Sequence, residues 1–270
     1  MLSITSDYVQ SDGNPEPYLR RIAEAGFTHV HWCHRWNGDH RYDGGEIDDI
    51  KKWLKRYGLR LLNLHASQGK KKYWVSYDEA QRLAGLKLVK NRIKMTARLG
   101  GQVMIIHIPT TELPENRPAR MVQICKSLDS LEAFTRSHGI RLALENLDHD
   151  DFQMLETLLA EYDPAYLGLC FDSGHANLGG HGLDKLEQHK DRLIALHLHD
   201  NDGISDQHKI PFTGTIDWLR LTGVIAASAY QQCVNLEVGI HHTGYKDEAD
   251  FLRHSLQAGE KLSAMIAAKK

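Results

Sequence analysis

The sequence predicts an α/β fold, a single (β/α)8 TIM barrel formed by residues 1–270. Short apolar runs alternate with longer amphipathic segments along the whole chain, and eight such runs are present. The runs are apolar throughout rather than at every second position, which is typical of parallel strands that are covered by helices. A length of 270 residues also suits a barrel of eight strand–helix units.

The eight expected strands are short and rich in apolar residues. They are 2–5, 28–33, 60–65, 102–108, 140–145, 166–172, 193–200 and 233–239. The segments between them carry apolar residues at three-to-four spacing and mostly stop at a glycine, a common signal for the end of a helix. The clearest helices are expected over 17–26, 46–58, 78–101 and 118–139. No linker or low-complexity run divides the chain, so we expect one domain.

Composition and charge argue against several classes of function. The chain carries 33 Lys and Arg against 35 Asp and Glu, so it lacks the basic excess of a protein that binds nucleic acid by neutralising phosphates. No apolar run approaches the roughly 18 residues of a membrane span, and no signal peptide is evident. The four cysteines are scattered, which suits a reducing compartment. We therefore expect a cytoplasmic protein without a membrane partner.

Histidine is unusually frequent, with 17 residues, and this points to a metal or acid–base site. In (β/α)8 barrels the chemistry collects at the C-terminal ends of the strands. Six successive strands, from the third to the eighth, each bring a potential metal ligand to that rim, and the loop after strand seven adds two more. The candidates are His65, His107, Glu145, Asp172, His175, His197, Asp206, His208 and Glu237.

Taken singly, most candidates have an ordinary explanation. A histidine at a strand end, such as His65 or His107, is more often a hydrogen-bonded side chain than a ligand, and Asp172 could cap the turn that follows it. Glu145 and Glu237 are harder to explain, because a carboxylate that ends an apolar strand is buried, and a buried charge needs a metal or a cation beside it. As a set, the residues predict a metal centre. Mixed carboxylate and imidazole ligands suit Mn, Co, Zn, Fe or Mg.

Four segments, in this order and spacing, resemble the xylose isomerase-like TIM barrel superfamily. They are LALENLD, CFDSGHAN, LHLHDNDGISDQHKIPFTGTIDW and NLEVG. The superfamily contains sugar and sugar-phosphate isomerases and epimerases, inositol-catabolism enzymes and endonuclease IV. The resemblance implies a metal-dependent enzyme that acts on a small-molecule carbohydrate. Such barrels often form dimers or tetramers, so a homo-oligomer is compatible with it.

Carried over to this chain, the superfamily's core metal site falls on Glu145, Asp172, His197 and Glu237. His197 is chosen over His199 because the family's ligand histidine stands three residues before an acidic residue, here Asp200. As in ketose 3-epimerases, Glu145 and Glu237 would also be the two catalytic carboxylates that transfer protons. The implied chemistry is metal-stabilised enediolate proton transfer in a sugar, sugar phosphate or related polyol or keto acid. It can end in isomerisation, epimerisation or, by loss of a β-hydroxyl, dehydration.

Endonuclease IV, which holds three zinc ions, provides the alternative function, a metal-dependent phosphoesterase acting on abasic DNA. Its additional ligands fall on His65, His107, His175, Asp206 and His208. These residues either bind up to two further ions beside the core ion or contact substrate, as His175 would in the epimerases. Basic residues do not cluster in the rim loops beyond GKKKYW at 69–74, so nucleic acid is the less favoured partner.

The loop after the second strand, HWCHRWNGDHRYDGG, provides the expected substrate contacts, His34 and Trp36. Tryptophan faces stack on sugar rings, although packing over the barrel top explains Trp36 equally well and Trp32 better. Lys209 is a third substrate-binding candidate, but Phe212 stands where the family usually has glycine, which points to a different turn there. A barrel that only binds a sugar or a partner would have no need for paired carboxylates around an ion.

Overall fold

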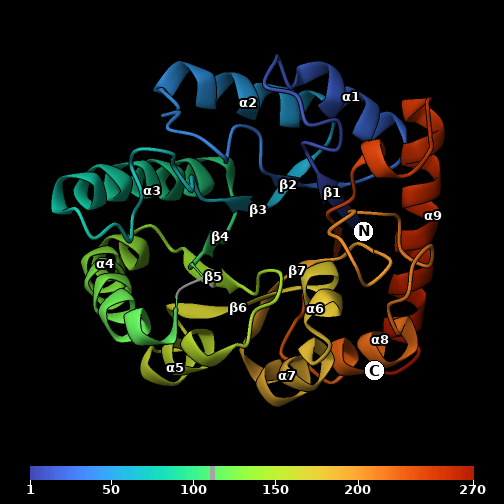
Figure 1. Cartoon of the computed structure of the whole chain (residues 1–270). Coiled ribbons are helices and arrows are strands. Elements are labelled where there is room, and N and C mark those ends of the chain that lie inside the picture. The colour runs from blue at the N-terminus through green and yellow to red at the C-terminus, as the bar shows by residue number, and fades with distance from the viewer. Residues whose placement is uncertain (110–112) are drawn as a thin grey trace.

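Eight parallel strands form the centre of the computed structural model, which describes residues 1–109 and 113–270, apart from the side chain of His242 (Figure 1). They are β1 (Leu2–Thr5), β2 (His29–Trp32), β3 (Arg60–His65), β4 (Val103–His107), β5 (Arg141–Glu145), β6 (Leu167–Asp172), β7 (Leu193–His197) and β8 (Val234–Leu236). The sheet order is β7-β6-β5-β4-β3-β2-β1-β8. All eight predicted strands are therefore confirmed, some of them shorter at the ends.

Helices follow the strands and surround them (Figure 1). They are α1 (Glu16–Glu24), α2 (Gly44–Arg56), α3 (Glu79–Leu99), α4 (Arg117–Ser137), α5 (Gln153–Glu161), α6 (Ser173–Gly179), α7 (Gly182–His189), α8 (Trp218–Ala226) and α9 (Glu248–Ala267). Short 3-10 helices occur at η1 (Pro114–Asn116), η2 (Lys190–Arg192) and η3 (Ile240–His242). Two helices rather than one follow β6, because Gly180 takes a left-handed conformation (φ 75°) that ends α6.

Backbone hydrogen bonds between the ends of β7 and β8 close the barrel. The amide of Leu198 donates to the carbonyl of Asn235 (3.1 Å), and the amide of Glu237 donates to the carbonyl of Leu198 (3.0 Å). Regular pairing of β7 stops earlier than the predicted residue 200, because Asp200 pairs in the antiparallel sense with Lys209 instead. The closure places the ends of β7 and β8 side by side at the rim.

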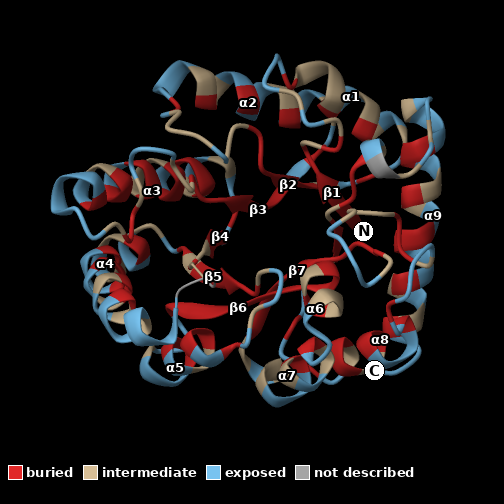
Figure 2. Ribbon diagram, in the orientation of Figure 1, coloured by how far each residue is buried: buried red, intermediate tan, exposed pale blue. Residues whose placement is uncertain are grey.

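Local sequence signals account for the helix boundaries. The side chain of Asp43 accepts a hydrogen bond from the amide of Glu46 at the start of α2, and the side chain of Glu46 accepts one from the amide of Asp43. Asp78 caps the start of α3 and Gly100 ends it in a left-handed conformation (φ 86°). Figure 2 shows buried strands and helices that are exposed on their outer faces. None of the helices in the described ranges is long and apolar enough to span a membrane.

Inside the barrel, an apolar layer of side chains lies below a polar rim at the strand ends. Small and aliphatic side chains from β4 to β7 pack together inside the barrel: Val103, Ile105, Ala143, Cys170, Ile194 and Ala195. Alternate residues of a strand share a face, so Ile105 and His107, or Ala143 and Glu145, point to the same interior. The apolar layer thus lies beneath the acidic and imidazole side chains at the strand ends.

Candidate metal centre and active site

The four residues expected to form the core metal site stand at the ends of neighbouring strands. Glu145, Asp172 and His197 are the last residues of β5, β6 and β7, and Glu237 directly follows β8. The register places Asp172 opposite His197. These positions confirm where the sequence places the side chains, while their role as ligands stays a prediction.

The Nδ1 atom of His197 lies between the two glutamates. It is 3.0 Å from Oε1 of Glu145 and 2.8 Å from Oε2 of Glu237, and Oδ2 of Asp172 is 4.0 Å away. Within the described residues, this nitrogen has no contact with hydrogen-bond geometry. His197 and Asp172 are fully buried, and Glu145 is 1% exposed. Two carboxylates therefore converge on one imidazole nitrogen in a buried site, as ligands around a common centre do.

The surrounding histidines favour the ionised form of both glutamates. Burial by itself raises the pKa of Glu145, but the charges of His197 and His107 outweigh it and hold the pKa well below its usual range. Burial also opposes ionisation of Glu237, and His197 again prevails and lowers the pKa. Ionised carboxylates can bind a cation or accept a proton.

The five additional candidates form two groups that flank the core. On one side, Nε2 of His107 lies 2.9 Å from Nε2 of His65 and 3.0 Å from Oε2 of Glu145. On the other, Oδ2 of Asp206 lies 2.9 Å from Nε2 of His208 and 3.4 Å from Nε2 of His175. His65 and His107 together with the core residue Glu145 offer three possible ligand atoms within 4.8 Å of one another, and so do His175, Asp206 and His208. The structure thus places all five next to the core, and their binding of ions or substrate stays a prediction.

Three of these histidines are held by the ring nitrogen that faces away from the cavity. Nδ1 of His65, His175 and His208 donates to a backbone carbonyl oxygen at 2.8, 3.0 and 2.7 Å, respectively. A carbonyl only accepts, so Nδ1 carries the proton in each of them. Nε2 then faces Glu145 in His65 (3.7 Å) and Asp206 in His208 and His175 (2.9 and 3.4 Å). Metal-binding histidines commonly hold their other nitrogen in this way.

A cavity of 420 Å³ opens at the barrel mouth and reaches Glu237 and His208. Trp36 lines it, with its ring centroid 4.4 Å from that of His65. The indole therefore lies beside the candidate ligands, where a substrate ring could stack on it. Arg35 and Lys70 line the same cavity.

For the two other predicted substrate contacts, His34 and Lys209, binding to substrate stays a prediction. Within the described residues, neither His34 nor Lys209 lines the mouth cavity. His34 is 5% exposed, and its ring meets that of Trp32 edge-on at 6.0 Å. Lys209 is tied to Asp200 by two backbone hydrogen bonds of 2.8 and 2.9 Å. Phe212 has φ 73°, a conformation that glycine adopts most readily.

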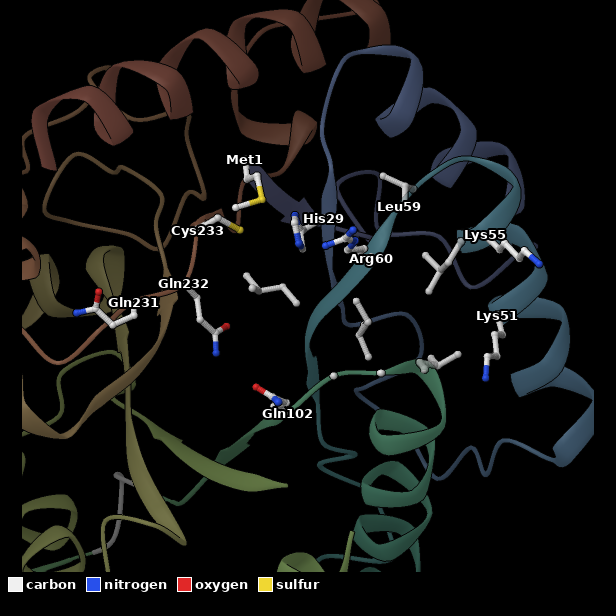
Figure 3. Close-up of a pocket in the computed structure, with 16 residues that line it drawn as sticks. Met1, His29, Lys51, Lys55, Leu59, Arg60, Gln102, Gln231, Gln232 and Cys233 are labelled. Atoms are coloured by element: carbon white, nitrogen blue, oxygen red, sulfur yellow. The ribbon is translucent and has the colours of Figure 1, made fainter. Parts of the chain in front are cut away.

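A second cavity, of 560 Å³, lies at the opposite end of the barrel, where the strands begin (Figure 3). Its lining includes His29, Arg60 and Gln102, at or next to the first residues of β2, β3 and β4. None of the predicted site residues lines it. The candidate chemistry is therefore confined to the C-terminal ends of the strands.

Comparison with known families agrees with this geometry. The family model described as xylose isomerase-like TIM barrel matches residues 19–255. The chain belongs to this family.

Relatives in the xylose isomerase-like TIM barrel family include proteins of known and unknown activity. An uncharacterised protein of Sinorhizobium fredii, y4fM, is 30% identical over 93% of this chain and 89% of its own length. A 3-dehydro-D-guloside 4-epimerase of Escherichia coli is 26% identical over 78% of this chain and 89% of its own. A solved D-tagatose 3-epimerase-like protein superposes with a TM-score of 0.79 at 19% identity, covering 99% of this chain and 97% of that one. The IOLI protein, solved with a bound zinc atom, has a TM-score of 0.73 at 16% identity, covering 100% and 99%.

Sequence reasoning about this family member did not single out His31, and it set His199 aside in favour of His197, although both histidines lie at the site. Nε2 of His199 lies 3.0 Å from Oδ1 of Asp172, and its ring stacks on that of His208 with centroids 4.0 Å apart. The available signal was the alternation of side chains along a strand. Residues 197 and 199 are two positions apart, so their side chains are expected on the same face. The packing that holds His199 depends on Gly174, where an added Cβ would lie 1.9 Å from Cε1 of His199.

Gly174→Ala is expected to displace His199 and destabilise the protein. Overpacking of this kind costs about 1–3 kcal/mol, which corresponds to a fall in Tm of about 2–10 °C. Gly223→Ala in α8 is the matched control, since its added Cβ meets Lys269 at an ordinary 3.4 Å and alanine favours a helix. Thermal melts followed by circular dichroism compare the two. Equal Tm values for Gly174→Ala and the wild type would contradict this account of His199.

Asp7, which lines the mouth cavity, should make stability depend on pH. Burial is the main reason why its pKa is raised from 3.8 to about 6. The pKa of Asp7 is higher in the folded state than in the unfolded state. Its contribution to the free energy of unfolding is therefore fully present below pH 3.8 and is lost as the pH rises through about 6. Asp7→Asn keeps an acceptor for the amide of Ser11 (2.9 Å) and removes the charge. We expect it to raise the free energy of unfolding by about 1–2 kcal/mol at pH 8, after allowance for partial exposure, and by about a third of that at pH 4.5. Urea unfolding at both pH values measures this, and an equal effect at the two would contradict it.

Proposed function

We propose that the protein is a divalent-metal-dependent isomerase or epimerase of a sugar, sugar phosphate or related polyol or keto acid. The observation that carries the proposal is the convergence of Glu145 and Glu237 on Nδ1 of His197 at the barrel mouth. The two glutamates come from β5 and from the residue after β8, so they approach the site from different strands. The similarity to the E. coli epimerase supports this reaction class.

The donor set fits a divalent ion. Glu145, Asp172, His197 and Glu237 supply three carboxylates and one imidazole, which Mn, Co, Zn and Mg all accept. Three carboxylates gathered in a buried site also need compensating positive charge. The zinc atom in the similar IOLI protein agrees with this donor chemistry. A bound divalent ion would polarise a substrate carbonyl and acidify the neighbouring C–H bond.

Glu145 and Glu237 are the proposed proton-transfer groups. One removes the proton from the carbon next to the carbonyl, and the same group or the other returns a proton. Return to the neighbouring carbon isomerises the substrate, and return to the opposite face epimerises it. Loss of a β-hydroxyl would make the enzyme a dehydratase. Nε2 of His175 faces Asp206 beside the core and can hold a substrate oxygen there, while Trp36 covers a ring face.

The two flanking groups favour a second candidate function, an endonuclease IV-like phosphoesterase with three ions. His65 with His107, and His175 with Asp206 and His208, are arranged as additional ligands would be. The mouth cavity argues for a small molecule instead, because Asp7 and Asp12 line it together with Arg35 and Lys70. A phosphate backbone would meet no net positive surface there.

Proton exchange with solvent distinguishes the two functions. A panel of keto sugars, sugar phosphates and inososes is incubated in D2O with Mn, Co, Mg or Zn and followed by proton NMR. The proposal predicts metal-dependent loss of one C–H signal next to a carbonyl, with or without a new product. Cleavage of an abasic DNA duplex without any such exchange would favour the phosphoesterase and contradict the proposal.

A further inference from the structure

His31, in β2, is buried inside the barrel next to the core residues. Its Nδ1 lies 2.7 Å from Oδ1 of Asn63. Its Nε2 lies 3.6 Å from Oε1 of Glu237, and the His31 and His197 ring centroids are 4.5 Å apart. A register shift between Val30 and His31 aligns His31 with Asn63 across the β2–β3 pair. This local irregularity sets the pairing that holds the imidazole.

The proton on His31 is placed by Asn63. The amide oxygen accepts, so Nδ1 carries the proton and Nε2 presents a lone pair. Within the described residues, Nε2 is buried and has no hydrogen-bond partner. His65 and His208 are held in the same way, with Nδ1 on a carbonyl oxygen and Nε2 toward a carboxylate, Glu145 or Asp206. The His31 ring thus has the same protonated nitrogen, and the same nitrogen with a free lone pair, as these candidate ligands.

The two oxygens of Glu237 face different imidazoles. Oε2 faces Nδ1 of His197, and Oε1 faces Nε2 of His31. An imidazole lone pair that faces a carboxylate oxygen is unfavourable in a buried site unless a positive charge joins them. His31, His197 and Glu237 can each offer a ligand atom within 4.8 Å of the others. One cation can therefore reach all three.

We propose that His31 is a further nitrogen ligand of the divalent ion, bound through Nε2 alongside His197 and Glu237. The proposal rests on the proposed function, because it adds a donor from β2 to the centre formed by β5, β6, β7 and the end of β8. It goes beyond the four residues of the core set.

Cobalt affinity provides the first test. Apo protein is titrated with Co²⁺ against a chelator, and His31→Gln is compared with His29→Gln, which alters the other end of the same strand. We expect the Kd for Co²⁺ to rise at least about tenfold in His31→Gln and to stay within about twofold in His29→Gln. Asn63→Ala, which keeps His31 but frees its ring, should also weaken binding, so the test does not depend on one variant folding.

Pulsed EPR of the protein loaded with less than one equivalent of Mn²⁺ provides the second test. His31→Gln should lose one coupled imidazole nitrogen relative to the wild type. Unchanged affinity and unchanged nitrogen coupling would overturn the proposal. Loss of turnover with both unchanged would also overturn it, and would make His31 a positioning residue that acts through Glu237. A wild-type protein that binds no Co²⁺ would instead contradict the proposed function itself.

Discussion

Glu237→Gln is expected to lower kcat by about 10²–10⁴ while leaving the protein folded, and Glu145→Gln should do the same. Glutamine keeps the shape of the side chain but cannot accept the proton from carbon. The fold should tolerate the change, because it removes a negative charge from a site where Glu145, Asp172 and Glu237 lie close together. The measurement is turnover on whichever substrate shows proton exchange, with thermal melts of the same samples.

Glu260→Gln is the matched control for both variants, since Glu260 is an exposed residue of α9. It should keep wild-type turnover and Tm. A Glu237→Gln enzyme with full activity would rule out proton transfer by Glu237. A partial loss that tracks a loss of bound metal would show that the carboxylate acts as a ligand alone.

Removing the metal is expected to abolish turnover and to lower the Tm. An ion that binds only the folded state adds about 2.7 kcal/mol when its free concentration is 100 times its Kd, which corresponds to a rise in Tm of about 5–10 °C for a chain of this size. The gain should appear when Mn²⁺ or Co²⁺ is added back to chelator-treated protein. It should be lost in Asp172→Asn, because the fully buried Asp172 belongs to the core set.

Asp191→Asn, at an exposed position in η2, is the control for Asp172→Asn and should keep the full gain. Differential scanning calorimetry with and without metal measures both. An equal rise in Tm on adding metal to the two variants would place the ion somewhere other than the predicted centre.

The barrel and the placement of the acidic residues could be predicted because they follow from simple patterns. A parallel strand buried on both faces is an uninterrupted apolar run, and the first polar residue at its end faces the mouth. Glu145 after RLAL and Asp172 after LGLCF illustrate this. The local contacts of the loop residues could not be predicted in this way. Lys209 is fixed by pairing with Asp200, and His34 by packing beside Trp32.

His31 was not predicted at the site and His199 was set aside, and the physical reasons differ. A register shift in the β2–β3 pair aligns His31 with Asn63, and no residue pattern marks such a shift. His199 lies beyond the regular part of β7 and is held against Asp172 by the turn that contains Gly174. In both cases the position depends on contacts between distant segments of the chain.

The central claim is that acidic and imidazole side chains from separate strands share one cation at the barrel mouth. Anomalous diffraction from crystals grown with Mn²⁺ or Co²⁺, recorded on both sides of the metal's absorption edge, tests it directly. The account predicts an anomalous peak within bonding distance of Glu145, Asp172, His197 and Glu237. A crystal in which these four side chains point to separate surroundings, with the peak elsewhere or none, would contradict it.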